Sequence, residues 1–145
     1  MKLASASVLL LMLTLAACDK SVDEIEEQRS IWLAHAPRAY AYTIQISGWR
    51  SPPDLLHPKR VTVSEVGTSA TYVWHSAEHE VGESALVGTY WSVTRVFDEL
   101  AEAKRRNAYV RARFDERGFV ERAFVDYAAP SSGWDVEIRD FQVAP

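Results

Sequence analysis

The segment that ends at Cys18 constrains this chain most, because it decides where the folded domain begins and what can hold it together. A single basic residue, Lys2, is followed by a run from Leu3 to Ala17 that carries no charge. Such a run fits the hydrophobic region of a signal peptide and is shorter than the ~20 apolar residues that a membrane-spanning helix needs. We therefore predict that residues 1–17 are removed on export and that the mature chain begins at Cys18.

The motif Leu15-Ala16-Ala17-Cys18, which ends this run, resembles the lipobox of bacterial lipoproteins. The resemblance implies cleavage before Cys18, a diacylglycerol on its sulfur, acyl chains such as palmitate, and attachment to a cell membrane on its periplasmic side. Asp19 resembles the signal that keeps enterobacterial lipoproteins in the inner membrane, and the outer membrane is the other destination. The alternative is an ordinary secreted protein, cut after Ala17, with a free thiol at its first residue.

Cysteine content and charge limit what the mature domain can do. Cys18 is the only cysteine in the sequence, so lipid attachment leaves no thiol for a disulfide, for catalysis or for a thiolate metal site. The remaining chain, about 128 residues long, is enough for one domain with one core. The full sequence has a net charge of -4 without long runs of one sign, which argues against nucleic acid as a partner.

The first helical signal follows a short lipidated tether, residues 18–20. Ser21 and Glu24 have the spacing of a capping box, and Pro37 closes the segment. The apolar residues at helical spacing between them are Val22, Ile25, Trp32, Leu33 and Ala36. We predict that a single folded domain, residues 21–145, opens with this helix.

A second helical signal lies in the middle of the chain. Thr94 is its predicted cap, Arg106 its last residue, and Asn107 suits the left-handed exit. Its predicted buried face comprises Val93, Val96, Phe97, Leu100 and Ala103 or Lys104.

Alternating apolar and polar residues predict about six strands. Gly118 suits the turn of a hairpin, and a change of face near Arg139 predicts a bulge or an early strand end. The predicted strands are 39–47, 59–66, 71–74, 109–114, 119–127 and 134–143, and a long connection at 75–92 holds one extra short strand at 86–91. The order helix, three strands, helix, three strands predicts an α+β domain, with a mainly antiparallel sheet and two helices packed on one face.

Several short motifs occur at matching places in these elements: Tyr40-x-Tyr42, Val61-Thr62-Val63, Val93-x-x-Val96-Phe97, Phe114-Asp115-x-x-Gly118-Phe119, and Asp126. In this arrangement the chain resembles, over most of residues 28–143, a family of small exported bacterial proteins classed as a domain of unknown function. Many of its members are lipoproteins, and many carry two cysteines after the first strand. This sequence has Gly48-Trp49-Arg50 there, so the resemblance implies no thiol role, and it implies no catalytic residues.

One segment has the formal pattern of a zinc site. His75-Ser76-Ala77-Glu78-His79 matches the H-x-x-E-H motif, in which two histidines one helical turn apart bind zinc. Because a strand is predicted immediately before it and Gly82 follows closely, we interpret the segment as a solvated loop. An envelope enzyme, such as a metal-dependent hydrolase using the cluster from His75 to Glu80, is the alternative. Among the scattered acids, Asp126 is expected to bond backbone amides rather than to act in catalysis.

The segment 48–58 holds the residues that we consider for binding. Trp49, Leu55 and Leu56 are large and apolar, and three prolines stiffen the chain around them. A stiff exposed aromatic residue is a typical interface anchor, although an apolar loop also folds back over its own core. We therefore predict a non-enzymatic binding or accessory lipoprotein that contacts an envelope protein and needs no cofactor. An inhibitor of an envelope enzyme, presenting this loop, is a further alternative.

Overall fold

The computed structural model describes residues 19–48, 57–65, 67–74, 77–80, 92–129 and 132–144. These residues contain two helices and seven strands. In chain order they are α1 (Val22–His35), β1 (Tyr40–Gly48), β2 (Lys59–Ser64), β3 (Gly67–Trp74), β4 (Ala77–Glu80), α4 (Val93–Arg105), β5 (Tyr109–Phe114), β6 (Val120–Asp126) and β7 (Trp134–Val143). Within the described residues, neither helix combines the length and apolar character that crossing a bilayer requires.

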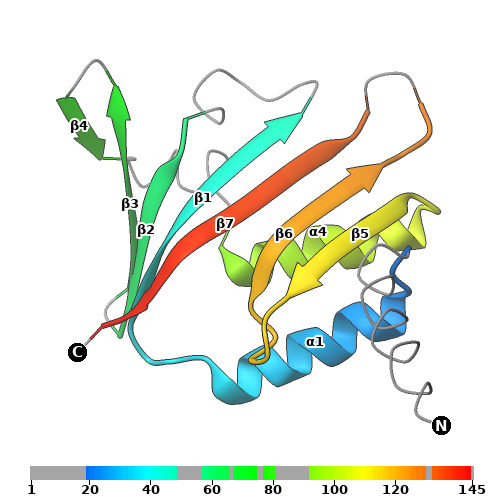
Figure 1. The fold of residues 1–145 in the computed structure, drawn as a ribbon, viewed down its shortest axis with the longest axis horizontal. Coiled ribbons are helices and arrows are strands. Elements are labelled where there is room, and N and C mark those ends of the chain that lie inside the picture. Colours follow the sequence, from blue (N-terminus) through cyan, green and yellow to red (C-terminus); the bar gives the residue numbers. More distant parts are fainter. Residues whose placement is uncertain are drawn as a thin grey trace, which may run out of the picture.

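All seven strands form one antiparallel sheet in the order β4-β3-β2-β1-β7-β6-β5 (Figure 1). The last strand, β7, lies between β1 and β6 and so joins the first meander to the C-terminal hairpin. The predicted α+β domain, with a mainly antiparallel sheet and helices on one face, is confirmed. Three details differ in the first meander: β2 ends at Ser64 rather than at residue 66, β3 begins at Gly67 rather than at residue 71, and β4 at Ala77–Glu80 extends the meander. The extra strand expected at 86–91 lies outside the described residues.

Helix α1 begins as its sequence predicts. The Ser21 N–H donates to Glu24 Oε2 at 2.8 Å and the Glu24 N–H donates to Ser21 Oγ at 3.2 Å, which completes the capping box. Ile25 and Trp32, two turns apart on one face, are buried. Leu33, whose helical spacing suggested the same face, is 61% exposed, because a one-residue step turns it about 100° from Trp32.

Helix α4 begins two residues earlier than predicted. The cap is Ser92, whose Oγ accepts the Arg95 N–H at 3.1 Å, so the expectation for Thr94 was wrong. Starting at Val93 places that side chain on the buried face, where 1% of it is exposed. Asn107 has a φ of 59°, which confirms the left-handed exit.

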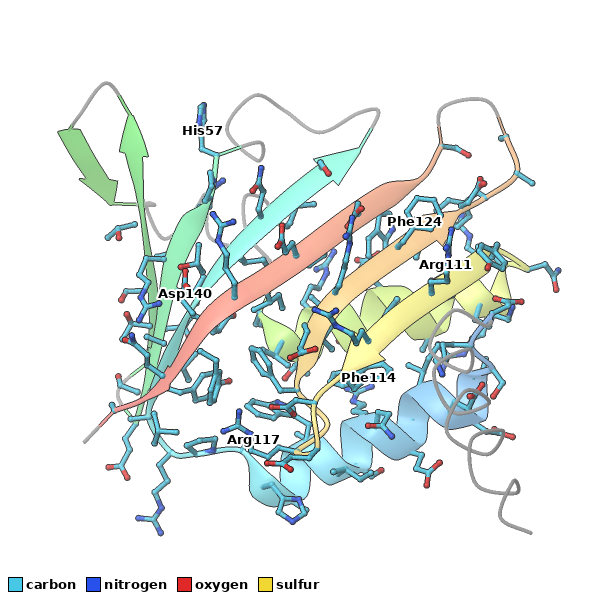
Figure 2. The ribbon with its side chains drawn as sticks, viewed as in Figure 1. His57, Arg111, Phe114, Arg117, Phe124 and Asp140 are labelled. Atoms are coloured by element: carbon cyan, nitrogen blue, oxygen red, sulfur yellow. The ribbon has the colours of Figure 1, made fainter. Side chains whose placement is uncertain are left out.

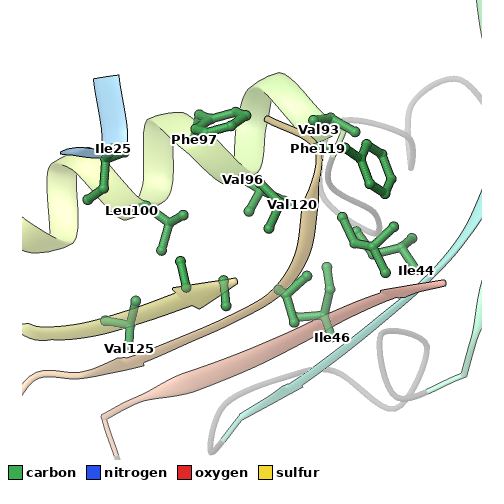
Figure 3. Close-up of a cluster of buried hydrophobic side chains, with 14 of the residues drawn as sticks. Ile25, Ile44, Ile46, Val93, Val96, Phe97, Leu100, Phe119, Val120 and Val125 are labelled. Carbon is green, nitrogen blue, oxygen red and sulfur yellow. The ribbon is translucent and has the colours of Figure 1, made fainter. Parts of the chain in front are cut away.

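The core lies between the two helices and the sheet. Figure 3 shows Val96 and Leu100 of α4 facing the strands, with Ile46 and Val125 among the side chains opposite them. All four are at most 4% exposed. With no cysteine in the described domain, this apolar packing is what holds α4 to the sheet.

A second packing region joins α1 to the β5–β6 hairpin. The turn residue Gly118 has a φ of 75°, and a Cβ built on it would lie 2.4 Å from the Gln28 carbonyl oxygen of α1. Glycine is therefore required both by the backbone conformation and by the close approach of the helix. Beside this turn, the centroid of the Phe119 ring lies 5.2 Å from the centroid of the Trp32 ring and 4.5 Å from that of the Phe141 ring.

The bulge expected near Arg139 is present in β7. Asp140 has a φ of 56°, and the register between β1 and β7 shifts between Ala41 and Thr43. This extra residue returns Phe141 to the helix side of the sheet, where it packs on Trp32. The bulge therefore extends the core along β7 as far as Phe141.

Candidate functional site

The sheet surface opposite the helices, which we call the outer face, carries the residues most suited to contact a partner. In β5, Val110 and Ala112 are buried toward α4, so the alternation of the strand turns Tyr109, Arg111 and Arg113 outward. The β5–β6 register places Phe124 opposite Arg111. The outer face of the hairpin therefore presents aromatic and cationic side chains side by side.

Tyr109, Arg111 and Phe124 form an aromatic–arginine cluster on this face. The guanidinium carbon of Arg111 lies 5.4 Å from the Tyr109 ring centroid and 5.5 Å from that of Phe124, within cation–π range. Figure 2 shows the side chains of Arg111 and Phe124 next to one another. Arg113 and Arg122 nearby form ion pairs with Glu121 at 2.7 Å and with Asp135 at 2.8 Å. Among the described residues, Arg111 has no such acidic partner.

An open pocket of about 340 Å³ adjoins the cluster where β6 ends and β7 begins. Its lining consists of Ser47, Gly48, Phe124, Asp126, Ala129, Ser132, Gly133, Trp134 and Asp135. Gly133 allows the strands to approach closely there, because a Cβ on it would lie 2.3 Å from the Val125 carbonyl oxygen. Phe124, which faces outward from β6, gives this outer-face pocket an aromatic wall.

The acids of the outer-face pocket are engaged in structural bonds. Asp126 Oδ1 accepts the Ala128 N–H at 2.8 Å, which confirms the expectation that this carboxylate bonds backbone. Asp135 pairs with Arg122, and its hydrogen bond raises the pKa of that guanidinium. Ser132 Oγ donates to the Ala129 carbonyl at 2.8 Å. The described lining therefore offers apolar walls and fixed polar edges, an arrangement suited to binding.

A second group of contacts holds Asp19 and Lys20, the described part of the tether, against β5. Asp19 Oδ1 accepts the Val110 N–H at 2.9 Å, and the Lys20 N–H donates to the Val110 carbonyl at 2.8 Å. The Lys104 ammonium also donates to Asp19, and this bond, followed by the one from Val110, holds the pKa of Asp19 below its ordinary value. Because β5 is an edge strand, these contacts occupy both outward backbone groups of Val110.

The structure does not describe the residues that the sequence analysis selected for binding. Cys18, Trp49, Leu55 and Leu56 lie outside the described residues, as do His75 and Ser76 of the zinc-like motif. Residues 77–80 form β4, which is extended, whereas the motif needs its histidines one helical turn apart. The loop expected there was thus partly wrong. Within the described ranges, no group of three or more potential metal-ligating residues comes together.

Sequence reasoning missed the aromatic–arginine cluster. Its signal was present, because Tyr109 and Phe124 are out of phase with the buried Val110 and Val125 in two strands that were both predicted. An aromatic residue on the polar side of an alternating strand is the feature that would have found it.

The fold is a small α+β domain with two helices on one face of an antiparallel sheet, and comparisons with known proteins assign its family. A family model described as a family of unknown function (DUF6174) matches residues 24–140, and the chain belongs to that family. Its membership agrees with the resemblance to a domain of unknown function drawn from the sequence. A search of curated proteins found no match.

Among solved structures, the chain is similar to the crystal structure of the lipoprotein LppX of Mycobacterium tuberculosis. The TM-score is 0.41 with 11% sequence identity, and the match covers 82% of this chain and 95% of the other.

Proposed function

We propose that the protein is a lipoprotein of the bacterial cell envelope that works by binding an envelope protein rather than by catalysis. Residues 1–17 are its signal peptide, Cys18 is acylated, and the domain faces the periplasm. The lipobox-like motif supports this proposal. The tether supports it too, because the residues immediately after Cys18 are bound to the surface of the domain.

The observation that carries the binding role is the outer-face pocket beside the aromatic–arginine cluster. Phe124 belongs to both, so the two features form one continuous surface. Aromatic and arginine side chains dominate the energetics of protein interfaces, and a concave site with few polar edges is typical of a binding surface. Gly48 lines the pocket and Trp49 follows it directly in the sequence, which supports a role for Trp49, Leu55 and Leu56 in the same contact.

Asp19 bears on which of the two membranes holds the anchor. Asp19 resembles an inner-membrane retention signal, which favours the inner membrane. The same carboxylate also holds the tether on β5, so its presence has a structural reason independent of sorting.

The anchor is tested by cell fractionation and mass spectrometry of the native protein and of Cys18→Ala. Acyl chains contribute ~0.8 kcal/mol for each buried CH₂, and two chains suffice for stable anchoring. We expect the native protein in the membrane fraction with an acyl mass that Cys18→Ala lacks. A native protein found mainly in the soluble fraction, with no such mass, would contradict the anchor.

The binding role is tested by photo-crosslinking in intact cells. A photoreactive residue at Ser132, on the pocket lining, should yield a discrete adduct that Phe124→Ala abolishes. Thr62, exposed on β2 of the same face, is the matched control position and should yield none. Equal adducts from both positions, unaffected by Phe124→Ala, would contradict a specific site.

A further inference from the structure

We propose that the tether fixes how the domain sits on its membrane, and that Tyr109 and Arg111, the β5 members of the aromatic–arginine cluster, contact the phospholipid headgroups beside the anchor. Phe124 and the pocket stay available to the protein partner. This inference rests on the proposed acylation of Cys18. Asp19 is bound by Lys104 and by the Val110 N–H, and the Lys20 N–H is bound to the Val110 carbonyl, so these two residues are not a free linker. A free linker would let the domain take any orientation, and a bound one does not.

The position of the tether determines which part of the domain is near the bilayer. Asp19 follows the acylated residue directly in the sequence and is bound to Val110 of β5. Because the lipid chains enter the hydrocarbon region, Asp19 and the β5 edge lie near the headgroups. Tyr109 and Arg111 flank Val110, the strand residue that binds the tether, and project from the outer face at this height.

The chemistry of the cluster suits a headgroup layer. Tyrosine is enriched at membrane interfaces, and an arginine can place its apolar stem beside aromatic rings while its charge reaches a phosphate. The acids near the tether are engaged: Asp19 binds Lys104 and Val110, and Glu102 pairs with Arg105 at 3.9 Å and Arg106 at 3.8 Å. Arg111, without an acidic partner among the described residues, is the cation best placed to meet an anionic lipid.

The β2 side of the sheet lies farther from the anchor than β5 does. β2 lies four strand positions from β5 in the sheet order, which is ~19 Å at the usual spacing between strands. Thr62 of β2 is exposed on the same outer face as the cluster. Positions 109 and 62 therefore report on one face at two distances from the anchor.

The test uses the mature acylated protein in vesicles of phosphatidylcholine and phosphatidylglycerol. Because lipid blocks the only native thiol, Tyr109→Cys and Thr62→Cys each give one site for a fluorophore. With nitroxide on the lipid headgroups, we expect strong quenching at position 109 and weak quenching at position 62. Asp19→Ala should leave the protein on the vesicles but make the two positions similar, because it releases the tether.

The lipid contact itself is tested by charge. With the label at position 109, Arg111→Gln should lower the ratio of docked to undocked protein about fivefold on phosphatidylglycerol vesicles, and little on pure phosphatidylcholine. Arg113→Gln is the matched control, because that arginine is already paired with Glu121. Equal effects of the two substitutions would overturn the role of Arg111.

The outcomes separate this inference from the proposed function. Equal quenching at positions 109 and 62 in acylated, vesicle-bound protein would overturn the fixed orientation while leaving the anchor intact. Protein that carries no acyl chain in cells would overturn the anchor first. A folded Asp19→Ala protein, checked by its circular dichroism, that keeps the native difference between the positions would show that the tether does not set the orientation.

Discussion

The two faces of the β5–β6 hairpin differ in what their side chains contact: one faces the core and the other faces solvent. On the helix side, Val110 and Val125 are fully buried beneath α4. On the outer side, one residue away in each strand, Arg111 and Phe124 lie in contact with each other and reach solvent. Strand alternation thus separates the residues that stabilise the domain from those available to a partner. We therefore expect the stability of the domain and the proposed binding to depend on different, neighbouring residues of the same strands.

The largest effect on stability should come from the helix side. Leu100 is fully buried, so Leu100→Ala removes apolar contacts and leaves a cavity, at a cost of ~2–5 kcal/mol in the free energy of unfolding. Urea unfolding of the mature protein measures this. Leu33→Ala, at an exposed position of α1, is the control and should change stability by less than ~0.5 kcal/mol. Similar losses for both would mean that the burial of α4 is misassigned.

The turn of the hairpin should be the next most sensitive position. Gly118→Ala forces a side chain into a left-handed conformation and against the Gln28 carbonyl oxygen, which we expect to cost at least ~1–3 kcal/mol. Gly67→Ala is the matched control, because Gly67 has a φ of 143° but no atom within 4 Å of a built Cβ. Thermal unfolding should therefore show a larger loss at Gly118, and an equal loss at both would exclude a role for the contact with α1.

The tether should respond to acid. A carboxyl whose pKa is lowered by folding stabilises the folded form above its ordinary pKa, and that contribution is lost as the pH falls through the lowered value. Docking of Asp19 on Val110 should therefore weaken only in acid, below the ordinary pKa of aspartate. The Val110 amide, followed by NMR during a pH titration, reports it. Asp19→Asn retains an acceptor but does not titrate, so its Val110 amide should show no such step. A step that persists in Asp19→Asn would assign it to another group.

The smallest effect on stability should come from the outer face. Arg111→Gln removes two exposed cation–π contacts, worth together ~1 kcal/mol or less. Urea unfolding should show a change in that range, well below the one at Leu100. A loss of several kcal/mol would mean that the cluster supports the fold, and the contrast between the two faces would fail.

The sequence predicted the local structure correctly wherever its pattern was consistent with only one structure. The capping box of Ser21, the alternation from Tyr42 to Ile46 and the Gly118 turn all predicted what the structure contains, because propensity, periodicity and turn chemistry agree there. The start of α4 was missed because Ser92 and Thr94 are both good caps, and only the burial of Val93 decides between them.

Other features depend on contacts that a local pattern does not encode. Strand β4 is short, and it becomes a strand by pairing with β3, as in the register of Thr71 with Glu80. The tether site joins Asp19 to Lys104 and Val110, which are far apart in the sequence. Likewise, the outer-face pocket forms where β1, β6 and β7 meet, so its lining could be assigned only once the strand order was known.

The most direct test of the account compares two adjacent residues on opposite faces. Phe124→Ala and Val125→Ala are measured side by side for unfolding free energy and for the in-cell adduct formed from position 132. We expect Val125→Ala to cost more stability but keep the adduct in the protein that remains folded, because its buried side chain does not face the partner. Phe124→Ala should remain nearly as stable as the native protein and lose the adduct. If Phe124→Ala instead keeps the adduct, or loses it only in proportion to its unfolding, the outer face is not the binding surface.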